Sequence, residues 1–291
     1  MEPILAGVAV DDPCCRESSD MATKALDARA RQRAASGAIG RMVDRWIYVF
    51  MALLYFVTVL VGFVPDSVAL LPLIRAGESP PLTPIWHLHA VAMGSWMLLF
   101  LAQTIFMATG RKELHKKLGL TAVALVPLMI ATMIGMTFTT WRWAYANLAA
   151  PALAEFKLVV SNILIEQIHA VVVFPLFVGW ALLVRRNDPE SHKRFMVQAI
   201  LPAFTAATDR IGWLPTTVPG SYASSYGYAL LWLSPLLIND LVQRRRLHSA
   251  YVIGLALMLL FFVVNHFLWN SPWWLATAPK LMGVAQPLNS P

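Results

Sequence analysis

The chain has 291 residues, of which 58% are hydrophobic and 13% are charged, whereas soluble globular chains carry about 25% charged residues. This composition excludes an ordinary soluble domain and predicts that the partner of the apolar surface is a lipid bilayer. The net charge of +7 falls in short segments between apolar runs. It therefore indicates membrane topology, and we expect no nucleic-acid partner.

The apolar residues gather into runs of about 20, which as helix at about 1.5 Å per residue cross a hydrocarbon layer of about 30 Å. We expect an all-α integral membrane protein whose transmembrane domain covers residues 46–269. Seven transmembrane helices are predicted, at residues 46–64, 85–110, 118–139, 159–184, 195–215, 226–242 and 250–269.

Most of the 23 basic residues lie on one side of these spans. They occupy the N-terminal tail and the segments around Arg111, Arg185 and Arg244. Because short cytoplasmic segments retain Lys and Arg, the N-terminus is predicted to be cytoplasmic and the C-terminus to lie on the opposite side. The far side carries the tryptophans typical of a membrane interface, which are Trp86, Trp141, Trp143, Trp213, Trp269, Trp273 and Trp274.

The two ends of the chain lie outside the predicted membrane domain. Residues 1–45 are expected to form a partly disordered cytoplasmic tail without a removable signal peptide, with disorder over 1–19 and a polar helix over 21–36 that ends at Gly37. Residues 270–291 are expected to form a non-cytoplasmic tail. Cys14 and Cys15 are adjacent, so they indicate no disulfide framework, and acylation or metal capture is the alternative role.

A weak internal repeat covers residues 86–139 and 166–215. Leu-His-Ala-Val at His89 corresponds to Ile-His-Ala-Val at His169, and His-Lys-Lys at His115 corresponds to His-Lys-Arg at His192. The two spacings between these histidines are 26 and 23 residues. Both units run in the same direction, so the second to fifth helices are predicted to form a pseudo-two-fold four-helix core.

The stretch from His89 to Arg210 resembles a family of uncharacterised bacterial membrane proteins known only as a domain of unknown function. The matching elements are His89 with Trp96 and Gln103, the runs that begin at His115 and His192, and Arg210. Two positions depart from the family pattern, where this chain has Lys116 and Leu120. The resemblance implies a multi-pass protein of the bacterial inner membrane and implies no activity.

Four of the ionisable residues within the predicted spans form a candidate cluster: Glu166, His169, Asp209 and Arg210. Ionisable groups inside a membrane are costly and usually face a cavity or a partner. Arg210 is expected to face the bundle interior and to pair with Glu166 or another acidic group. The spacing of Glu166 and His169 also occurs in di-iron bundles, but the other carboxylates that such a site needs are missing from the spans.

The paired histidines suggest a second kind of site. His89 opposite His169, and His115 opposite His192, would resemble the cytochrome b561 and heme A synthase class, in which heme b sits between helices with two His ligands. That resemblance implies transmembrane electron transfer or heme handling, with a redox partner or a quinone. Arg210 joins the four histidines as a candidate cofactor-binding residue. The propionates would be held at the inner face by Lys116, Lys117, Lys193 and Arg194.

Two other functional classes remain open. The first is a proton-coupled or small-solute transporter or channel that uses the cluster of Glu166, His169, Asp209 and Arg210. The second is a cofactor-free assembly or scaffold subunit. A retinal photoreceptor is disfavoured, because the last span has no lysine that could form a Schiff base.

Overall fold

The computed structural model describes residues 13–215 and 222–284. Every element within those ranges is a helix, so the all-α prediction is confirmed for the described part of the chain. The chain divides into two compact units, Met1–Trp46 and Ile47–Pro291. The described part of the first unit is the beginning of a long helix, α1 (Pro13–Ala76).

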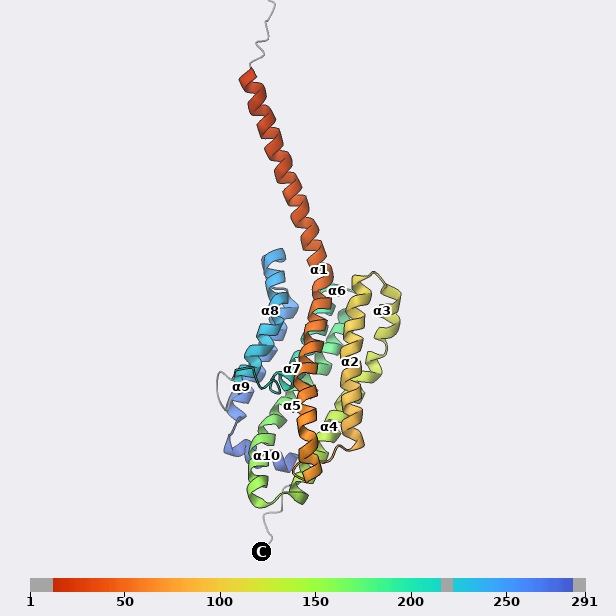
Figure 1. Cartoon of the computed structure of the whole chain (residues 1–291), viewed down its shortest axis with the longest axis vertical. Coiled ribbons are helices and arrows are strands. Elements are labelled where there is room, and N and C mark those ends of the chain that lie inside the picture. Colours follow the sequence, from red (N-terminus) through yellow and green to blue (C-terminus); the bar gives the residue numbers. More distant parts are fainter. Residues whose placement is uncertain (1–12, 216–221, 285–291) are drawn as a thin grey trace, which may run out of the picture. The chain divides into compact units, whose positions relative to one another are not determined.

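The second unit is a helical bundle (Figure 1). Its loops rich in Arg and Lys, after α2, after α5 and after α8, lie at the end of the bundle drawn uppermost in Figure 1, which we call the basic end. After α1 the elements are α2 (Pro84–Ala108), α3 (Lys112–Gly119), α4 (Ala122–Asn147), α5 (Ala150–Val184), α6 (Pro189–Gln198), α7 (Leu201–Thr208), α8 (Ala223–Arg244), α9 (Ser249–Leu268) and α10 (Pro272–Leu281).

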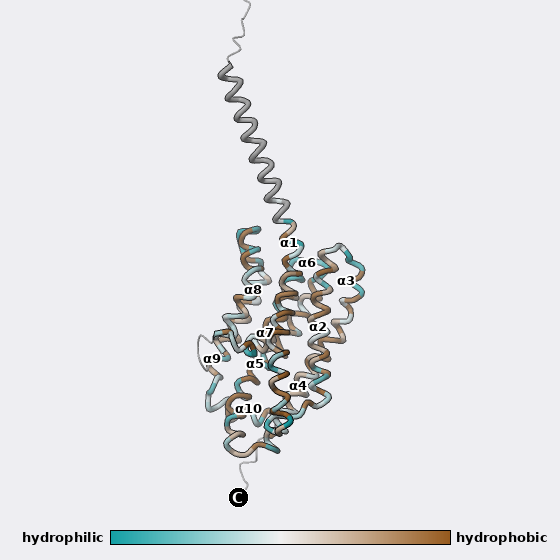
Figure 2. The backbone as a smooth tube through the Cα atoms, in the orientation of Figure 1, coloured by the Kyte–Doolittle hydropathy of each residue, from teal (hydrophilic) through white to brown (hydrophobic). Residues whose placement is uncertain are grey.

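Within the described residues, five stretches are long and apolar enough to cross a membrane. They are residues Gly40–Ala76 of α1, together with α2, α4, α5 and α9. Hydrophobic residues recur along the helices of the bundle (Figure 2), and many of them are exposed, among them Leu183, Val242 and Phe267, which are each more than 70% exposed. Because a soluble monomer rarely exposes apolar surface on this scale, these features indicate a multi-pass membrane protein.

Two of the predicted spans are not among these five stretches. Residues 195–215 were expected to form one helix, but α6 ends at Gln198 and α7 is only eight residues long. Pro202 lies in the first turn of α7, and since proline has no N–H and its ring crowds the preceding turn, it favours a break before that point. The span predicted at 226–242 corresponds to α8, whose polar residues Ser225, Asn239 and Asp240 lower its hydropathy.

The two repeat units share an order of elements. In each unit a long helix, α2 or α5, is followed by a short helix, α3 or α6, and then by a further helix, α4 or α7. His115 and His192 each occupy the fourth position of the short helix. The third helix packs against the first in both units, α4 against α2 and α7 against α5.

The ends of the chain also differ from the sequence-based expectation. The helix begins at Pro13 and continues through Gly37, because one glycine costs a helix only about 1 kcal/mol. The expected disorder of residues 1–12 lies outside the described residues. In the C-terminal segment α10 packs against α5: the indole of Trp274 is buried and donates from Nε1 to the Ser161 carbonyl at 2.7 Å. Residues 285–291 are not described.

The helices approach closely where glycine leaves room. A Cβ atom added at Gly62 of α1 would lie 2.3 Å from the backbone oxygen of Ala207 on α7. Because that oxygen belongs to the main chain, no side-chain rotation relieves the contact. Gly62 therefore sets the separation of α1 and α7.

We predict that Gly62→Ala destabilises the protein by about 1–3 kcal/mol, because the two helices must move apart and loosen the contacts around them. Thermal unfolding in detergent measures the change. The matched control is Gly94→Ala on α2, where an added Cβ meets nothing within 4 Å and the substitution should leave stability equal or slightly higher. Equal unfolding temperatures for the two variants would contradict the prediction.

Candidate functional site

The candidate site begins with Glu166 and His169, which share one face of α5 because residues three apart in a helix are neighbours. Thr205 of α7 donates to Glu166 Oε2 at 3.1 Å, and Asn265 Nδ2 of α9 donates to Glu166 Oε1 at 2.7 Å. Tyr226 Oη of α8 lies 3.1 Å from Asn265 Nδ2 and 3.2 Å from His169 Nδ1. Four helices therefore meet at one series of hydrogen-bonded side chains. We call this series the Glu166 chain; its members are Thr205, Glu166, Asn265, Tyr226 and His169.

The direction of each hydrogen follows from the atoms involved. The Asn265 amide has two hydrogens, and it gives one to Glu166 and the other to Tyr226. The Tyr226 hydroxyl accepts that hydrogen and can donate its own to His169 Nδ1. Neutral His169 then carries its proton on Nε2. In this arrangement the hydrogen bonds that Glu166 accepts stabilise a negative charge on its carboxylate.

Two polar atoms at this chain are buried without a hydrogen-bond partner, namely His169 Nε2 and Asn265 Oδ1. The His169 ring is 2% exposed and stacks on Phe261, with a centroid distance of 4.1 Å and an interplanar angle of 16°. Buried polar groups usually have partners, so unpartnered ones mark a site where water, a proton or a ligand would act. The site thus offers one N–H donor and one carbonyl acceptor beside a carboxylate.

The other two members of the predicted cluster have direct partners outside the Glu166 chain, although the charge of Asp209 is near enough to act on Glu166. Asp209 is exposed and accepts a hydrogen bond from Ser225. Arg210 is also exposed: its Nε lies 3.1 Å from Asp66 Oδ2, and its guanidinium lies 4.6 Å from the centre of the Phe63 ring. Arg210 therefore pairs with an acidic group, as expected, but its partner is Asp66 of α1 at the surface and not Glu166, so the expected position in the bundle interior is wrong.

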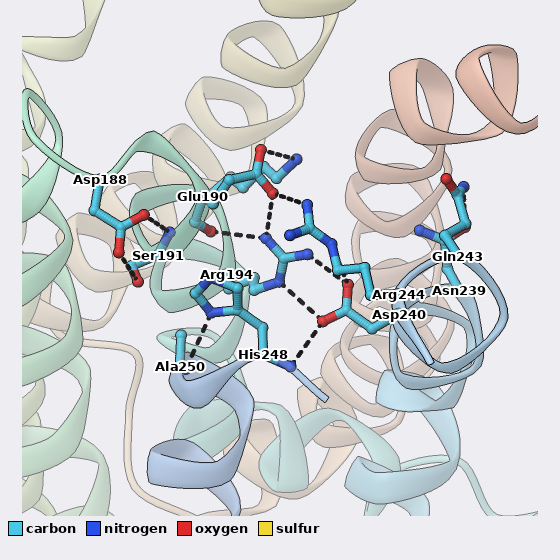
Figure 3. A network of polar contacts seen from close by, with 11 residues as sticks. Asp188, Glu190, Ser191, Arg194, Asn239, Asp240, Gln243, Arg244, His248 and Ala250 are labelled. Carbon is cyan, nitrogen blue, oxygen red and sulfur yellow. Dashed lines mark hydrogen bonds and ion pairs between the residues drawn. The ribbon is translucent and has the colours of Figure 1, made fainter. Parts of the chain in front are cut away.

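A second polar group lies at the basic end of the bundle, where α6, α8 and the start of α9 meet (Figure 3). The side chains of Arg194 and Asp240 are each 2% exposed. Arg194 donates to Asp240 from Nη2 at 2.5 Å and from Nε at 3.2 Å. The backbone N–H of His248 donates to the same carboxylate at 3.0 Å. A bidentate buried pair of this kind fixes the position of both side chains.

Glu190 extends this network toward solvent. Its carboxylate accepts from Arg194 Nη1 at 2.7 Å and from Lys193 Nζ at 2.8 Å, and it also pairs with Arg244. Burial by itself would raise the pKa of Glu190. The hydrogen bonds and charges of Lys193 and Arg194 outweigh this effect and lower the pKa to about 2. Glu190 therefore stays ionised at physiological pH. We call Glu190, Arg194, Asp240 and Arg244 the basic-end network.

Among the four histidines of the repeat, the structure brings His115 and His192 together. Their ring centroids are 6.3 Å apart with an interplanar angle of 88°. His192 Nδ1 lies 2.8 Å from the Ala181 carbonyl, whereas His115 Nδ1 is buried without a partner. Burial lowers the pKa of both side chains, which favours the neutral form of each.

The other repeat-related pair is not brought together in the same way. His89 Nδ1 lies 3.1 Å from Thr132 Oγ1 on α4, whereas His169 bonds to Tyr226 and stacks on Phe261. Between α2 and α5, Trp96 and Phe174 meet edge to face with centroids 4.9 Å apart. Within residues 13–215 and 222–284, no group of three or more His, Cys, Asp or Glu side chains could hold a metal ion.

Sequence reasoning missed three residues of the Glu166 chain: Thr205, Tyr226 and Asn265. Asn265 gave the clearest signal, because an amide in the middle of an apolar run is costly without a partner. Tyr226 and Thr205 gave no such signal, since hydroxyl side chains are common in membrane helices and often bond to their own backbone.

Comparisons with known proteins add no relative, because no protein-family model, curated protein or solved structure matches this chain. The resemblance noted between His89 and Arg210 thus rests on the quoted motifs alone.

Proposed function

We propose that this protein couples its function to proton movement across a membrane, with Glu166 as the group that takes up and releases the proton. The observation that carries the proposal is the Asn265 amide, which joins Glu166 to Tyr226 and through it to His169. An ionisable residue inside a membrane is a functional candidate by default. Here it also has a chain of hydroxyl and imidazole groups beside it.

The proposed membrane arrangement has seven crossings. The five apolar helices supply five of them, and the broken pair α6 and α7 and the helix α8 supply the other two. The basic end faces the cytoplasm of a bacterial inner membrane, because Lys and Arg in short loops are retained on that side. Broken helices at membrane depth recur in transporters, where they surround binding sites at the middle of the bilayer.

The charge of the site favours a proton or another cation over an anion. Arg210 is paired with Asp66 and so does not neutralise Glu166. The polar groups that do contact Glu166, from Thr205 and Asn265, are uncharged. An anion would therefore meet an uncompensated carboxylate in a medium of low dielectric constant, where repulsion is strong.

A protonation cycle would reverse part of the hydrogen-bonded chain. When His169 gains a second proton, its Nδ1 becomes a donor, so the Tyr226 hydroxyl must turn and accept. When Glu166 gains a proton, the attraction that orients the Asn265 amide weakens. Tyr226 and Asn265 are thus positioning residues that connect the protonation states of His169 and Glu166.

We predict that Glu166→Gln lowers proton flux into proteoliposomes by about tenfold or more, because groups that transfer protons typically contribute factors of this size. A pH-sensitive dye inside the vesicles, read under an imposed membrane potential, measures the flux. Glutamine keeps the shape of the side chain and can still accept from Asn265, so folding should be preserved.

The matched control is Glu155→Gln, which removes an exposed carboxylate from the same helix and should leave the flux unchanged. Equal flux in the wild type and in Glu166→Gln would overturn the proposal.

A second candidate function is heme binding at His115 and His192, and the observation that favours it is the 6.3 Å separation of their rings. Metal–imidazole bonds are about 2 Å long, so one metal ion could lie between the rings. The bond from His192 Nδ1 to the Ala181 carbonyl would leave Nε2 for the metal, a common arrangement for ligating histidines. Heme b bound there would supply electron transfer.

The surrounding charges fit this candidate less well. Of the basic residues expected to hold propionates, Lys116 pairs with Glu113, Lys193 with Glu190, and Arg194 with Asp240. His89 and His169 contact different helices, so one heme is proposed and not two. We therefore rank heme binding below proton coupling.

If heme binds at this pair, protein expressed with ample heme should show a b-type reduced-minus-oxidised absorption spectrum. His192→Ala should then remove the signal, because an axial ligand is lost, while His169→Ala should leave it unchanged. A colourless wild-type protein would eliminate this candidate.

A further inference from the structure

The same helices carry both polar groups of the bundle. Tyr226 and Asp240 lie 14 positions apart on α8, which corresponds to about 21 Å along a helix. Arg194 and Thr205 similarly belong to the broken pair of α6 and α7. The basic-end network and the Glu166 chain therefore occupy two levels of one helical group.

Between these two levels the bundle is apolar and tightly packed. The side chains at this level are at most 8% exposed and come from α7, α8 and α9: Leu201, Phe204, Leu233, Leu236 and Met258. Gln198 borders this layer and donates from Nε2 to the Ala250 carbonyl at 2.9 Å. Access to the Glu166 chain from the basic end would have to cross this layer.

Points at which these helices can bend lie between the two levels. The break between α6 and α7 falls at Ala199 and Ile200. Pro235 interrupts the hydrogen bonding of α8 between Asp240 and Tyr226, and Pro175 does so in α5 on the basic-end side of His169. Sharp kinks and hinges in helices arise at such positions.

We propose that the basic-end network is a closure that shuts the Glu166 site off from the cytoplasm, with the α6–α7 break and Pro235 as its hinges. This inference rests on the proposed function, since it concerns access to the same site. Asp240 holds α8 against α6 through Arg194, and it holds the start of α9 through the backbone of His248. Arg244 and Glu190 join the same two helices across the surface.

The closed state is stabilised by the charged side chains of the basic-end network, which lose their partners when the basic end opens. Separating Arg194 from Asp240 leaves two charges in an apolar surrounding, which favours the closed state strongly. Removing the charge of Asp240 alone leaves Arg194 with Glu190 as an acidic partner closer to solvent. An Asp240→Asn protein should therefore open at the basic end more often than the wild type.

The test is the rate at which a membrane-impermeant maleimide, added on the cytoplasmic side, labels Leu236→Cys. Leu236 is 1% exposed and lies one helical turn from Asp240 toward the Glu166 site. Cys14 and Cys15 are replaced by serine in the parent protein. We expect Asp240→Asn to raise the labelling rate by about tenfold or more, because a buried pair is broken, and Arg244→Gln to raise it less.

Two controls separate local opening from other effects. Lys116→Gln breaks an exposed ion pair with Glu113 and should leave the rate unchanged. A second reporter, Met129→Cys, replaces a buried residue of α4 and should keep its slow rate in the Asp240→Asn protein. The closure is contradicted if labelling at position 236 stays at the parent rate, or if both reporters speed up together. If Asp240→Asn does not fold, Arg244→Gln decides by the same comparison.

The labelling rate requires no proton flux, so it is independent of the flux assay. An unchanged labelling rate would contradict the proposed closure but would not affect the interpretation of the Glu166→Gln flux. A normal proton flux in Glu166→Gln would contradict the proposed function. The labelling rate would still show whether the basic end opens.

Discussion

The structure of this protein depends on the hydrogen bonds of Asn265. The Asn265 side chain is 0% exposed in the helical bundle, and lipid offers no partner for an amide or a carboxylate. By giving its two hydrogens to Glu166 and Tyr226, Asn265 binds α9 to α5 and α8 at one point. The arrangement makes a carboxylate tolerable inside the bundle and keeps it next to groups that can exchange a proton.

The two polar levels of the bundle stabilise their buried charged groups in different ways. At the basic end, full charges neutralise one another, because Arg194 faces Asp240 and Glu190. At the deeper level the carboxylate of Glu166 meets only neutral donors. The first arrangement favours rigidity, since breaking a buried ion pair strands both charges. The second leaves a group whose charge can change at lower cost, which suits a site of proton exchange.

Much of the architecture could be predicted from the sequence, because apolar runs of about 20 residues have few structural solutions other than membrane helices. The contact between His115 and His192 also agrees with the repeat.

Helix partners were harder to predict: periodicity placed Glu166 and His169 on one face, but it does not say which residues of other helices meet that face. The sequence also gives no sign that Arg194 is buried, because its partner Asp240 lies 46 positions away. The surface position of Arg210 is equally hard to predict, because its partner Asp66 lies 144 positions away, just beyond the first predicted span. The break at Ala199 could have been found from Pro202.

The central claim is that Glu166 binds and releases a proton within the bundle while Asn265 holds it in place. Infrared difference spectroscopy of the protein in lipid vesicles, recorded across a pH titration, measures this directly. The account predicts a carbonyl band of a protonated carboxylic acid that appears as the pH falls, is absent in Glu166→Gln and changes frequency in Asn265→Leu. Identical difference spectra for the wild type and Glu166→Gln would contradict the account, because no proton would then be exchanged at Glu166.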